Sequence, residues 1–184
     1  MMERRGPAGC AERGNMCETN SGYAGSARHS RIEGLKVRDI MTPEPQALLP
    51  DESVSRAAVL MRDADVGMIP IVSGLKNREL VGVITDRDIV VRHVAAHHDW
   101  DCSVEEHMTK ERLASVEPED GVFLAIRLMK DALIRRIPVT DPDGRLVGIL
   151  ALADIARHLG PEAPTTVEEL LERVSEPAHL PAPV

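Results

Sequence analysis

A threonine and an aspartate three residues apart, Thr85 and Asp88, are the pair in the sequence best suited to bind a ligand. They follow a short apolar run, Leu80 to Ile84, which predicts a strand ending at Thr85 and a helix whose first turn holds Asp88. This spacing places a hydroxyl and a carboxylate beside backbone N–H groups that the start of a helix leaves free. A carboxylate accepts hydrogen bonds from vicinal ribose hydroxyls, while hydroxyl and N–H groups donate to phosphate. The pair therefore indicates nucleotide binding.

The same spacing has a plainer interpretation, which the pair by itself leaves open. Thr85 can serve as the N-cap of the helix, with Asp88 at the third helical position. That arrangement satisfies orphan N–H groups and stabilises a helix whether or not a ligand is present. The elements around the pair must decide between nucleotide binding and simple capping.

The pair lies in a segment that occurs twice in the chain. Segment 82–89 returns as 148–155, segment 69–70 as 137–138, and segment 37–42 as 104–109. The offset between the copies therefore stays between 66 residues (Gly82 to Gly148) and 68 residues (Ile69 to Ile137). Because the offset drifts so little, the insertions must lie in loops, and each copy is one structural unit.

Each copy predicts the same secondary structure. The first helix has apolar residues at i, i+3, i+4 and i+7: Val54, Ala57, Ala58 and Met61 in one copy, Val122, Ala125, Ile126 and Met129 in the other. Two short strands joined by a polar turn follow and predict a hairpin. A second helix begins near Thr85 or Leu152. Strand, helix, hairpin and helix, twice, indicate an α+β fold in which two small sheets bury their apolar faces against each other.

The chain outside the repeat has a different composition. Residues 1–34 are rich in Gly, Ser, Arg, Asn and Glu, with almost no aliphatic side chains, which predicts a disordered tail. The first copy then covers residues 35–100 and the second covers 101–160. In residues 161–184, Thr166 and Glu169 have capping-box spacing, which predicts a short helix before a Pro-rich end. That helix either packs on its own domain or binds a partner.

Composition excludes several classes of function. The 184 residues carry a formal net charge of -8 and contain one Phe, one Tyr and one Trp. An acidic chain repels a phosphate backbone, and so few rings offer no stacking platform, so we expect no nucleic-acid partner. No apolar run reaches the roughly 18 residues that a membrane span needs, so we expect no membrane partner. Three widely spaced cysteines suit a reducing compartment, and we predict a cytoplasmic protein.

The repeated signature carries a family resemblance. Gly82-Val83-Ile84-Thr85-Asp86-Arg87-Asp88-Ile89, the opening Asp-Ile-Met-Thr at 39–42, and Arg-Arg-Ile-Pro-Val at 135–139 resemble the CBS-domain family. The tandem pair, over about residues 35–160, is similar to the family's two-copy unit, the Bateman module. The resemblance implies two CBS repeats packed about a pseudo-two-fold axis, paired into a homodimer. It also implies a regulatory function without catalysis or cofactor, in which an adenine nucleotide changes the packing of the copies and an unknown protein partner responds.

The resemblance also implies where the ligand binds. In the family, the Thr and Asp of one copy face the loop before the Ile-Pro of the other copy. The first site would therefore consist of Thr85, Asp88, Arg87, Ala114, Arg135, Arg136 and Ile137. Adenine would lie against aliphatic side chains and backbone, and Arg87 and Arg136 would bind phosphate, unless both are ordinary surface arginines. The ligand would be AMP, ADP, ATP or another adenosine compound.

The second site departs from this pattern. It would consist of Asp154, Met68, Ile69 and Pro70. Ala151 stands where the first copy has Thr85, and one lost hydrogen bond costs about 0.5 to 1.5 kcal/mol, or about tenfold in affinity. The second site is therefore predicted to be weak or empty. Gly67 also replaces a basic residue that some relatives use for phosphate, which argues against triphosphates.

Two other functions remain as alternatives. A ligand-free dimeric scaffold for protein interaction is favoured by Ala151 and Gly67. His93 and His97 stand at i and i+4, with His98, Cys102 and His107 following, and such a set could hold a metal or sense redox state. A solvated helix end explains the histidines more simply, because histidine suits the negative end of the helix dipole. We therefore predict no metal site.

Overall fold

The computed structural model describes residues 34–99, 101–111 and 113–159, with residues 168, 171–173 and 175 of the C-terminal region. The predicted disordered tail, apart from Gly34, and the Pro-rich end lie outside these residues. Glu168, Leu171 to Arg173 and Ser175 are helical. Among the described residues, none of the helices has the length and apolar character needed to cross a membrane.

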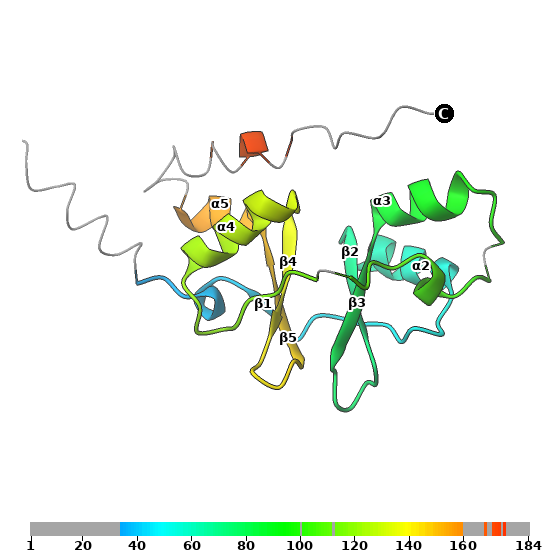
Figure 1. The fold of residues 1–184 in the computed structure, drawn as a ribbon, viewed down its shortest axis with the longest axis horizontal. Helices are drawn as coiled ribbons and strands as arrows, with labels where there is room; N and C mark the ends of the chain where they lie inside the picture. Colours follow the sequence, from blue (N-terminus) through cyan, green and yellow to red (C-terminus); the bar gives the residue numbers. More distant parts are fainter. Residues whose placement is uncertain are drawn as a thin grey trace, which may run out of the picture.

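The elements follow the repeat (Figure 1). In chain order they are η1 (Val37–Asp39), β1 (Thr42–Pro43), α2 (Val54–Ala64), β2 (Met68–Val72), β3 (Leu80–Thr85), α3 (Asp86–Asp88), η2 (Ile89–Val94), η3 (Val104–Glu106), α4 (Val122–Ala132), β4 (Arg136–Thr140), β5 (Leu146–Ala151) and α5 (Leu152–Leu159). Helix, hairpin and helix therefore occur in each copy, and the predicted α+β fold is confirmed. The helix after β3 has a π turn over Ile89–Val94, whereas its counterpart α5 is a regular α-helix.

Local sequence explains where α2 begins and where α2 and α4 end. The hydroxyl of Ser53 caps α2 by accepting from the N–H of Arg56 at 3.1 Å. Asp65 and Leu133 stop α2 and α4 in the left-handed conformation, with φ of 52° and 54°. In each copy the chain then reverses and enters the first strand of the hairpin, β2 or β4.

Each hairpin pairs with a short segment from the opening of the other copy, an arrangement called strand exchange below. One sheet has the order β1-β5-β4, with Thr42 opposite Ile149 and Pro43 opposite Gly148, so a first-copy strand joins the second-copy hairpin. The other sheet, β2-β3, receives the matching residue of the second copy, because Thr109 forms an antiparallel bridge with Val83. Each half of the molecule is therefore built from both copies.

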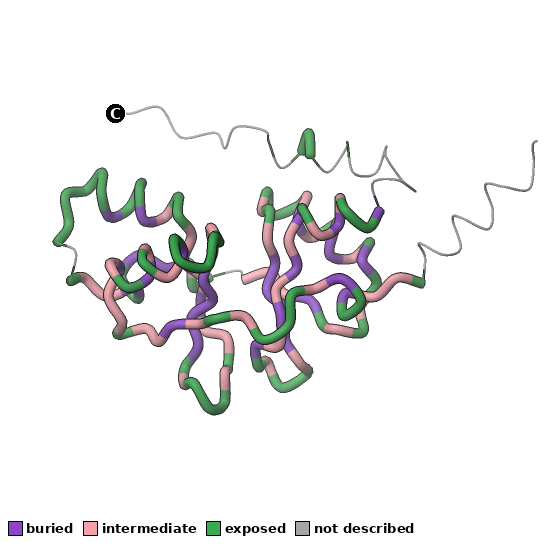
Figure 2. The backbone as a smooth tube through the Cα atoms, turned by 180° about the vertical axis from the view of Figure 1, so that it is seen from behind, coloured by how far each residue is buried: buried purple, intermediate pink, exposed green. Residues whose placement is uncertain are grey.

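The same exchange divides the core. The first-copy core contains Leu48, Val54, Ala57, Met61, Ile69, Ile71, Ile84 and Ile89, together with Val104 and Met108 from the second copy. The second-copy core contains Val116, Val122, Ala125, Ile126, Met129, Ile137, Val139, Leu150, Leu152, Ile155 and Leu159, together with Val37 and Ile40 from the first copy. In Figure 2 the buried residues follow the strands and the inner faces of the helices in both halves.

Two glycines make the exchange sterically possible. A Cβ at Gly82 would lie 2.7 Å from Sδ of Met108, and a Cβ at Gly148 would lie 2.6 Å from Sδ of Met41. Both separations are far shorter than carbon and sulfur tolerate. The glycine in each copy of the signature therefore allows the methionine of the other copy to cross the strand.

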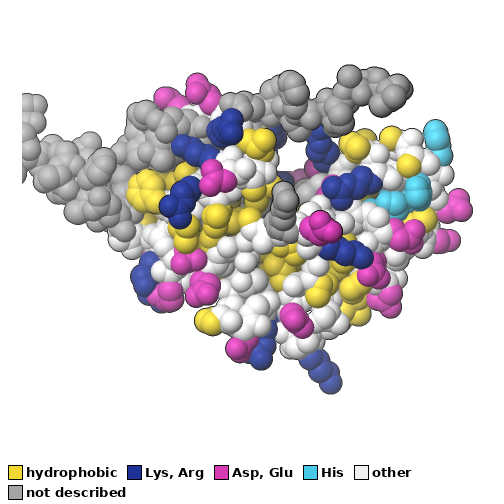
Figure 3. All heavy atoms as spheres, viewed as in Figure 1, with side chains coloured by type: hydrophobic (Ala, Val, Ile, Leu, Met, Phe, Trp, Pro, Cys, Tyr) yellow, Lys and Arg dark blue, Asp and Glu magenta, His cyan; other side chains and the backbone are white. Residues whose placement is uncertain are grey.

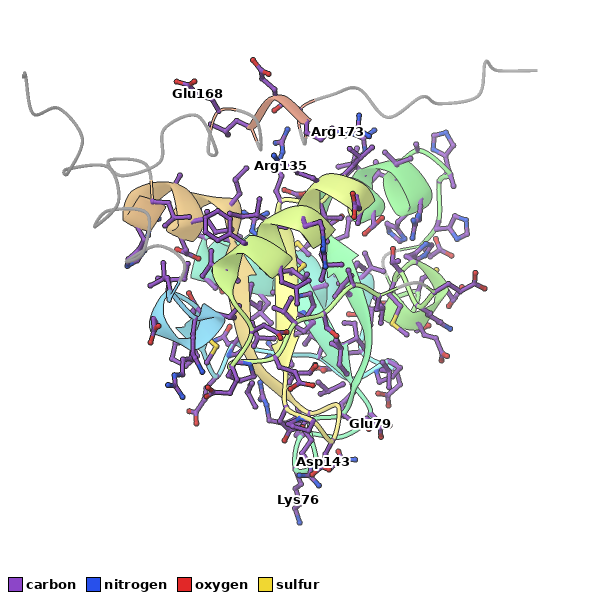
Figure 4. All side chains as sticks on the ribbon, turned by 60° about the vertical axis from the view of Figure 1, so that its left-hand side comes forward. Lys76, Glu79, Arg135, Asp143, Glu168 and Arg173 are labelled. Atoms are coloured by element: carbon purple, nitrogen blue, oxygen red, sulfur yellow. The ribbon has the colours of Figure 1, made fainter. Side chains whose placement is uncertain are left out.

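The turns of the two hairpins are joined to each other. The N–H of Leu80 donates to the carbonyl of Gly144 at 3.0 Å, and the N–H of Leu146 donates to the carbonyl of Arg78 at 2.7 Å. Figure 4 shows Lys76, Glu79 and Asp143 at this end of the molecule and Arg135 at the opposite end. The strands leave the hydrogen-bonded turns and run toward α3 and α5, where the signature residues lie.

Candidate nucleotide-binding site

Thr85 and Asp88 form a reciprocal cap at the start of α3. Oδ2 of Asp88 accepts from the N–H of Thr85 at 3.0 Å and from its hydroxyl at 2.7 Å. The N–H of Asp88 in turn donates to Oγ1 of Thr85 at 3.1 Å. Oδ1 of Asp88 lies 3.4 Å from Nη2 of Arg92, one turn along the helix. One carboxylate oxygen is thus used by the cap, and the other lies beside the guanidinium of Arg92.

The structure corrects the prediction that the N–H groups at this helix start are free. The N–H of Asp86 donates to the carbonyl of Gly67 at 3.2 Å, and that of Arg87 donates to Oδ1 of Asp86 at 2.7 Å. With the N–H of Asp88 bound to Thr85, the first three helical N–H groups all have acceptors. The carbonyl of Gly67 and the side chains of Asp86 and Thr85 accept from the N–H groups that the sequence analysis expected to donate to phosphate. These N–H groups are therefore not free to donate to phosphate in this conformation.

The second copy keeps the carboxylate and lacks the hydroxyl. Oδ2 of Asp154 accepts from the N–H of Ala151 at 3.1 Å, and its Oδ1 accepts from Nη1 of Arg157 at 3.3 Å. The side chains of Asp88 and Asp154 are 14% and 16% exposed, so both carboxylates are equally accessible. The two turns therefore differ in the hydroxyl that Ala151 lacks and, at the next residue, in having Leu152 where the first copy has Asp86.

Gly67 lets the two copies approach each other at this end. A Cβ at Gly67 would lie 2.7 Å from Oδ2 of Asp86 and 3.1 Å from Nη1 of Arg136. The guanidinium of Arg136, from the second copy, thus reaches the loop that holds the start of α3 in the first copy. The positive charge that position 67 lacks is supplied from the other copy. Figure 3 shows a notch between the halves at the helical end, with Lys or Arg side chains on both sides.

The remaining predicted residues of the first site surround this boundary. Arg87 and Arg135 are exposed, and the carbonyl of Arg135 accepts from the N–H of Leu152 at 2.9 Å. Ala114 is half-buried against the second-copy core, which also contains the fully buried Ile137. Because Ile137 is fully buried, its side chain has no surface exposed to a ligand in this conformation.

The predicted second site is more deeply enclosed. Met68, Ile69 and Pro70 are all buried in β2, and Ile69 belongs to the first-copy core. Met68 lies opposite Thr85 in the hairpin, as Arg136 lies opposite Ala151. The first site thus has an arginine at a position where the second has a buried methionine.

Sequence reasoning did not include two residues of the turn at Asp88 among the site residues. Arg92 contacts Asp88 at i+4, and its Nη1 also donates to the carbonyl of His107 at 2.9 Å. The i+4 spacing was the signal that could have found it. Asp86 stands inside the signature itself, and only the fold reveals that its carboxylate lies near Arg136.

The interpretation of the histidines as a solvated helix end is wrong for His93. His93 is fully buried, and its Nδ1 lies 3.3 Å from Nε2 of His107, which is 3% exposed. His97, by contrast, is exposed. Burial, with the neighbouring His93 and His98 rings, lowers the pKa of His107. The π turn and the strand exchange bring these side chains together, which helical spacing alone does not predict.

Comparison with known proteins agrees with this architecture. The CBS domain matches the chain twice, at residues 37–93 and 104–161. The chain belongs to the CBS-domain family. The CBS domain-containing protein YhcV of Bacillus subtilis is 39% identical over 120 residues, which are 65% of this chain and 82% of that protein. The resemblance inferred from the repeated signature is confirmed.

Solved CBS structures share the fold. Hypoxic response protein I, solved with two coordinated zinc ions, has 36% identity and a TM-score of 0.61 and covers 68% of this chain and 99% of its own. CBSX2 in complex with AMP has 30% identity and a TM-score of 0.59, covering 68% and 96%. The CBS domain pair of MJ0100, in complex with 5'-methylthioadenosine and S-adenosyl-L-methionine, has 28% identity and a TM-score of 0.62, covering 68% and 100%.

An enzyme also matches, but only in part. Inosine-5'-monophosphate dehydrogenase of Streptococcus pyogenes is 35% identical over 114 residues, which are 62% of this chain. The chain spans only 22% of the length of that enzyme. The similarity is therefore to a CBS region within a larger protein.

Proposed function

We propose that this protein is a regulatory module that binds an adenosine compound, AMP in the simplest case, at the boundary between its two CBS domains. The approach of Arg136, from the second copy, to Gly67 and to the turn that holds Asp88 in the first copy carries the proposal. A carboxylate oxygen beside Arg92 suits ribose hydroxyls, and a guanidinium that reaches across the boundary suits phosphate. The complexes of CBSX2 with AMP and of MJ0100 with two adenosine compounds support this class of ligand.

The strand exchange explains how binding would be transmitted. Arg136 and Asp88 belong to different copies, so a ligand that contacts both binds best when the halves hold one relative arrangement. Ligand binding then shifts the population toward that arrangement by its difference in affinity for the alternatives. The hydrogen-bonded hairpin turns hold the far end together, so movement would concentrate at the helical end.

The helical faces favour a homodimer. Val90, Val91 and Val94 of the helix after β3 are 59%, 52% and 43% exposed, and Phe123 of α4 is 41% exposed. Apolar side chains gathered on helices mark interaction surfaces. In sedimentation, wild type should form a dimer that Val91→Lys weakens, whereas a wild-type monomer at all concentrations would contradict the pairing.

A ligand-free scaffold is the second candidate function. The Thr85 hydroxyl and the helical N–H groups already have partners within the protein, so the turn is complete without a ligand. Under this alternative Asp88 serves only as a helix cap. Ligand binding distinguishes the two functions directly.

The test is a thermal-shift screen of the full chain with AMP, ADP, ATP, S-adenosyl-L-methionine and 5'-methylthioadenosine. A compound that binds only the folded state stabilises it by about 2.7 kcal/mol at 100 times its Kd. We expect AMP to raise the unfolding temperature of wild type and to have much less effect on Arg136→Met, which keeps an apolar stem without charge. If none of the compounds shifts wild type at millimolar concentration, the scaffold function is favoured.

A further inference from the structure

The two halves differ in kind at three matching positions. Leu35, Ile40 and Leu159 line or contact the second-copy core. Their counterparts at offsets of 67, 67 and 66 residues are Cys102, His107 and His93. The match is structural as well, because the N–H of Val54 donates to the carbonyl of Cys102 as that of Val122 donates to Leu35, at 2.9 and 3.0 Å. Apolar packing residues in one half are thus replaced in the other by residues that bind metals.

Four potential metal ligands converge at this place. One ligand atom each from His98, Cys102, Glu106 and His107 lies within 4.8 Å of all the others. The rings of His98 and His107 are 5.0 Å apart and nearly perpendicular. His107 is buried, Cys102 is half-buried, and His98 and Glu106 are exposed, so the cluster has a closed inner side and an open outer side. Figure 3 shows histidine side chains gathered at this end of the molecule, among acidic ones.

The backbone holds His98 over the cluster. His97 adopts φ of 57°, the N–H of His97 donates to the carbonyl of Val94 at 3.1 Å, and that of His98 donates to His93 at 3.2 Å. These paired bonds form a Schellman motif, which ends the helix and folds the chain back across its last turn. The reversal places His98 beside the buried ring of His93, with centroids 6.1 Å apart.

The opening segment of the second copy presents the other ligands. Cys102 is fixed by the bond from Val54 to its carbonyl. Oε1 of Glu106 accepts from the hydroxyl of Ser103 at 3.1 Å, which holds this carboxylate at the start of η3. Nδ1 of His93, 3.3 Å from Nε2 of His107, orients that ring from behind. A metal-binding histidine usually has its second ring nitrogen hydrogen-bonded, and His93 is placed to fill that role for His107.

We propose that His98, Cys102, Glu106 and His107 form a tetrahedral site for a zinc-class transition metal ion. Two imidazoles, a thiolate and a carboxylate are a ligand set that suits Zn²⁺. Bond lengths of about 2.0 to 2.3 Å place tetrahedral ligands about 3.3 to 3.8 Å apart, so the widest pair must close by about 1 Å. The exposed side chains of His98 and Glu106 can make this movement by rotation. The metal joins the end of the first copy's last helix to the opening segment of the second.

The experiment loads the full chain with one equivalent of Co²⁺ or Zn²⁺ after chelation and dialysis. The background carries Cys10→Ser and Cys17→Ser, so that Cys102 is the single thiol. Cys102→Leu and His107→Ile introduce the residues that the other half carries at the matching positions, which protects the fold. His97→Asn is the matched control, because asparagine tolerates a left-handed conformation and His97 is outside the ligand set. His93→Leu tests the supporting contact.

We expect one metal per chain in wild type, with a thiolate-to-cobalt charge-transfer band that Cys102→Leu abolishes. Zn²⁺ affinity should fall about 10- to 100-fold in His93→Leu, by more in His107→Ile, and not at all in His97→Asn. Chelation should lower the unfolding temperature of wild type and leave that of Cys102→Leu unchanged. Absence of metal binding to the background protein, or metal binding by His107→Ile and Cys102→Leu as tight as that of the background protein, would overturn the proposal.

Discussion

Replacing each signature aspartate separately tests the asymmetry of the two sites. Oδ2 of Asp88 is held by the cap, so Oδ1 is the oxygen available to ribose. A hydrogen bond to a charged group contributes about 1.5 to 3 kcal/mol, so Asp88→Ala should weaken AMP binding about 10- to 150-fold. Asp154→Ala should have a much smaller effect, because its site lacks a hydroxyl at Ala151 and an arginine at the position of Met68.

The two substitutions are matched in their effect on stability. Each removes a carboxylate that accepts from the first N–H of its turn, at 3.0 Å in one copy and 3.1 Å in the other. Each should therefore reduce the free energy of unfolding by a similar amount, about 0.5 to 2 kcal/mol. A fall in unfolding temperature consequently does not distinguish a ligand contact from a helix cap, whereas a binding measurement does.

Calorimetric titration with AMP is the deciding assay. We expect one tight site per chain, lost in Asp88→Ala and retained in Asp154→Ala. Ala151→Thr restores the missing hydroxyl and should strengthen any second binding event by up to about tenfold. Greater damage from Asp154→Ala would invert the site assignment, and unchanged affinity in Asp88→Ala would show that this carboxylate only caps α3.

Three further changes test the architecture. Deleting residues 1–34 should leave the thermal unfolding midpoint unchanged, because their composition buries too little to stabilise the fold; a drop of several degrees would contradict this. Residues 35–100 expressed alone lack Val104 and Met108 and should aggregate or self-pair, so a folded monomer in sedimentation would refute the shared cores. Gly82→Ala should lower the free energy of unfolding in urea by about 1 to 3 kcal/mol through collision with Met108, and an unchanged midpoint would show that the methionine moves freely.

The repeat made most of the secondary structure predictable. The apolar stripes from Val54 and Val122 became α2 and α4, and the paired apolar runs became the two hairpins. Periodicity succeeds here because it reports which side of an element is buried, and burial determines each element locally. The same reasoning located Thr85 and Asp88 at a helix start, since capping depends on residues close together in the sequence.

Contacts between distant residues were beyond that reasoning. The spacing of Thr85 and Asp88 does not show that the first helical N–H groups donate to acceptors within the protein, one of which is the side chain of Asp86. The placement of Arg136 at Gly67 depends on how the two copies pack, and a sequence pattern does not specify that packing.

The sequence by itself determined the repeat, the elements and the difference between Thr85 and Ala151, because each follows from residue types at short spacing. Only the tertiary structure decided which residues of one copy enter the core of the other copy. The repeat places Val104 and Met108 in the opening segment of the second copy but does not name the core that receives them, and the packing of the two copies sends them to the core of the first. The same packing brings His107 to His93 and His98, because burial is set by the whole chain while spacing describes only a part of it.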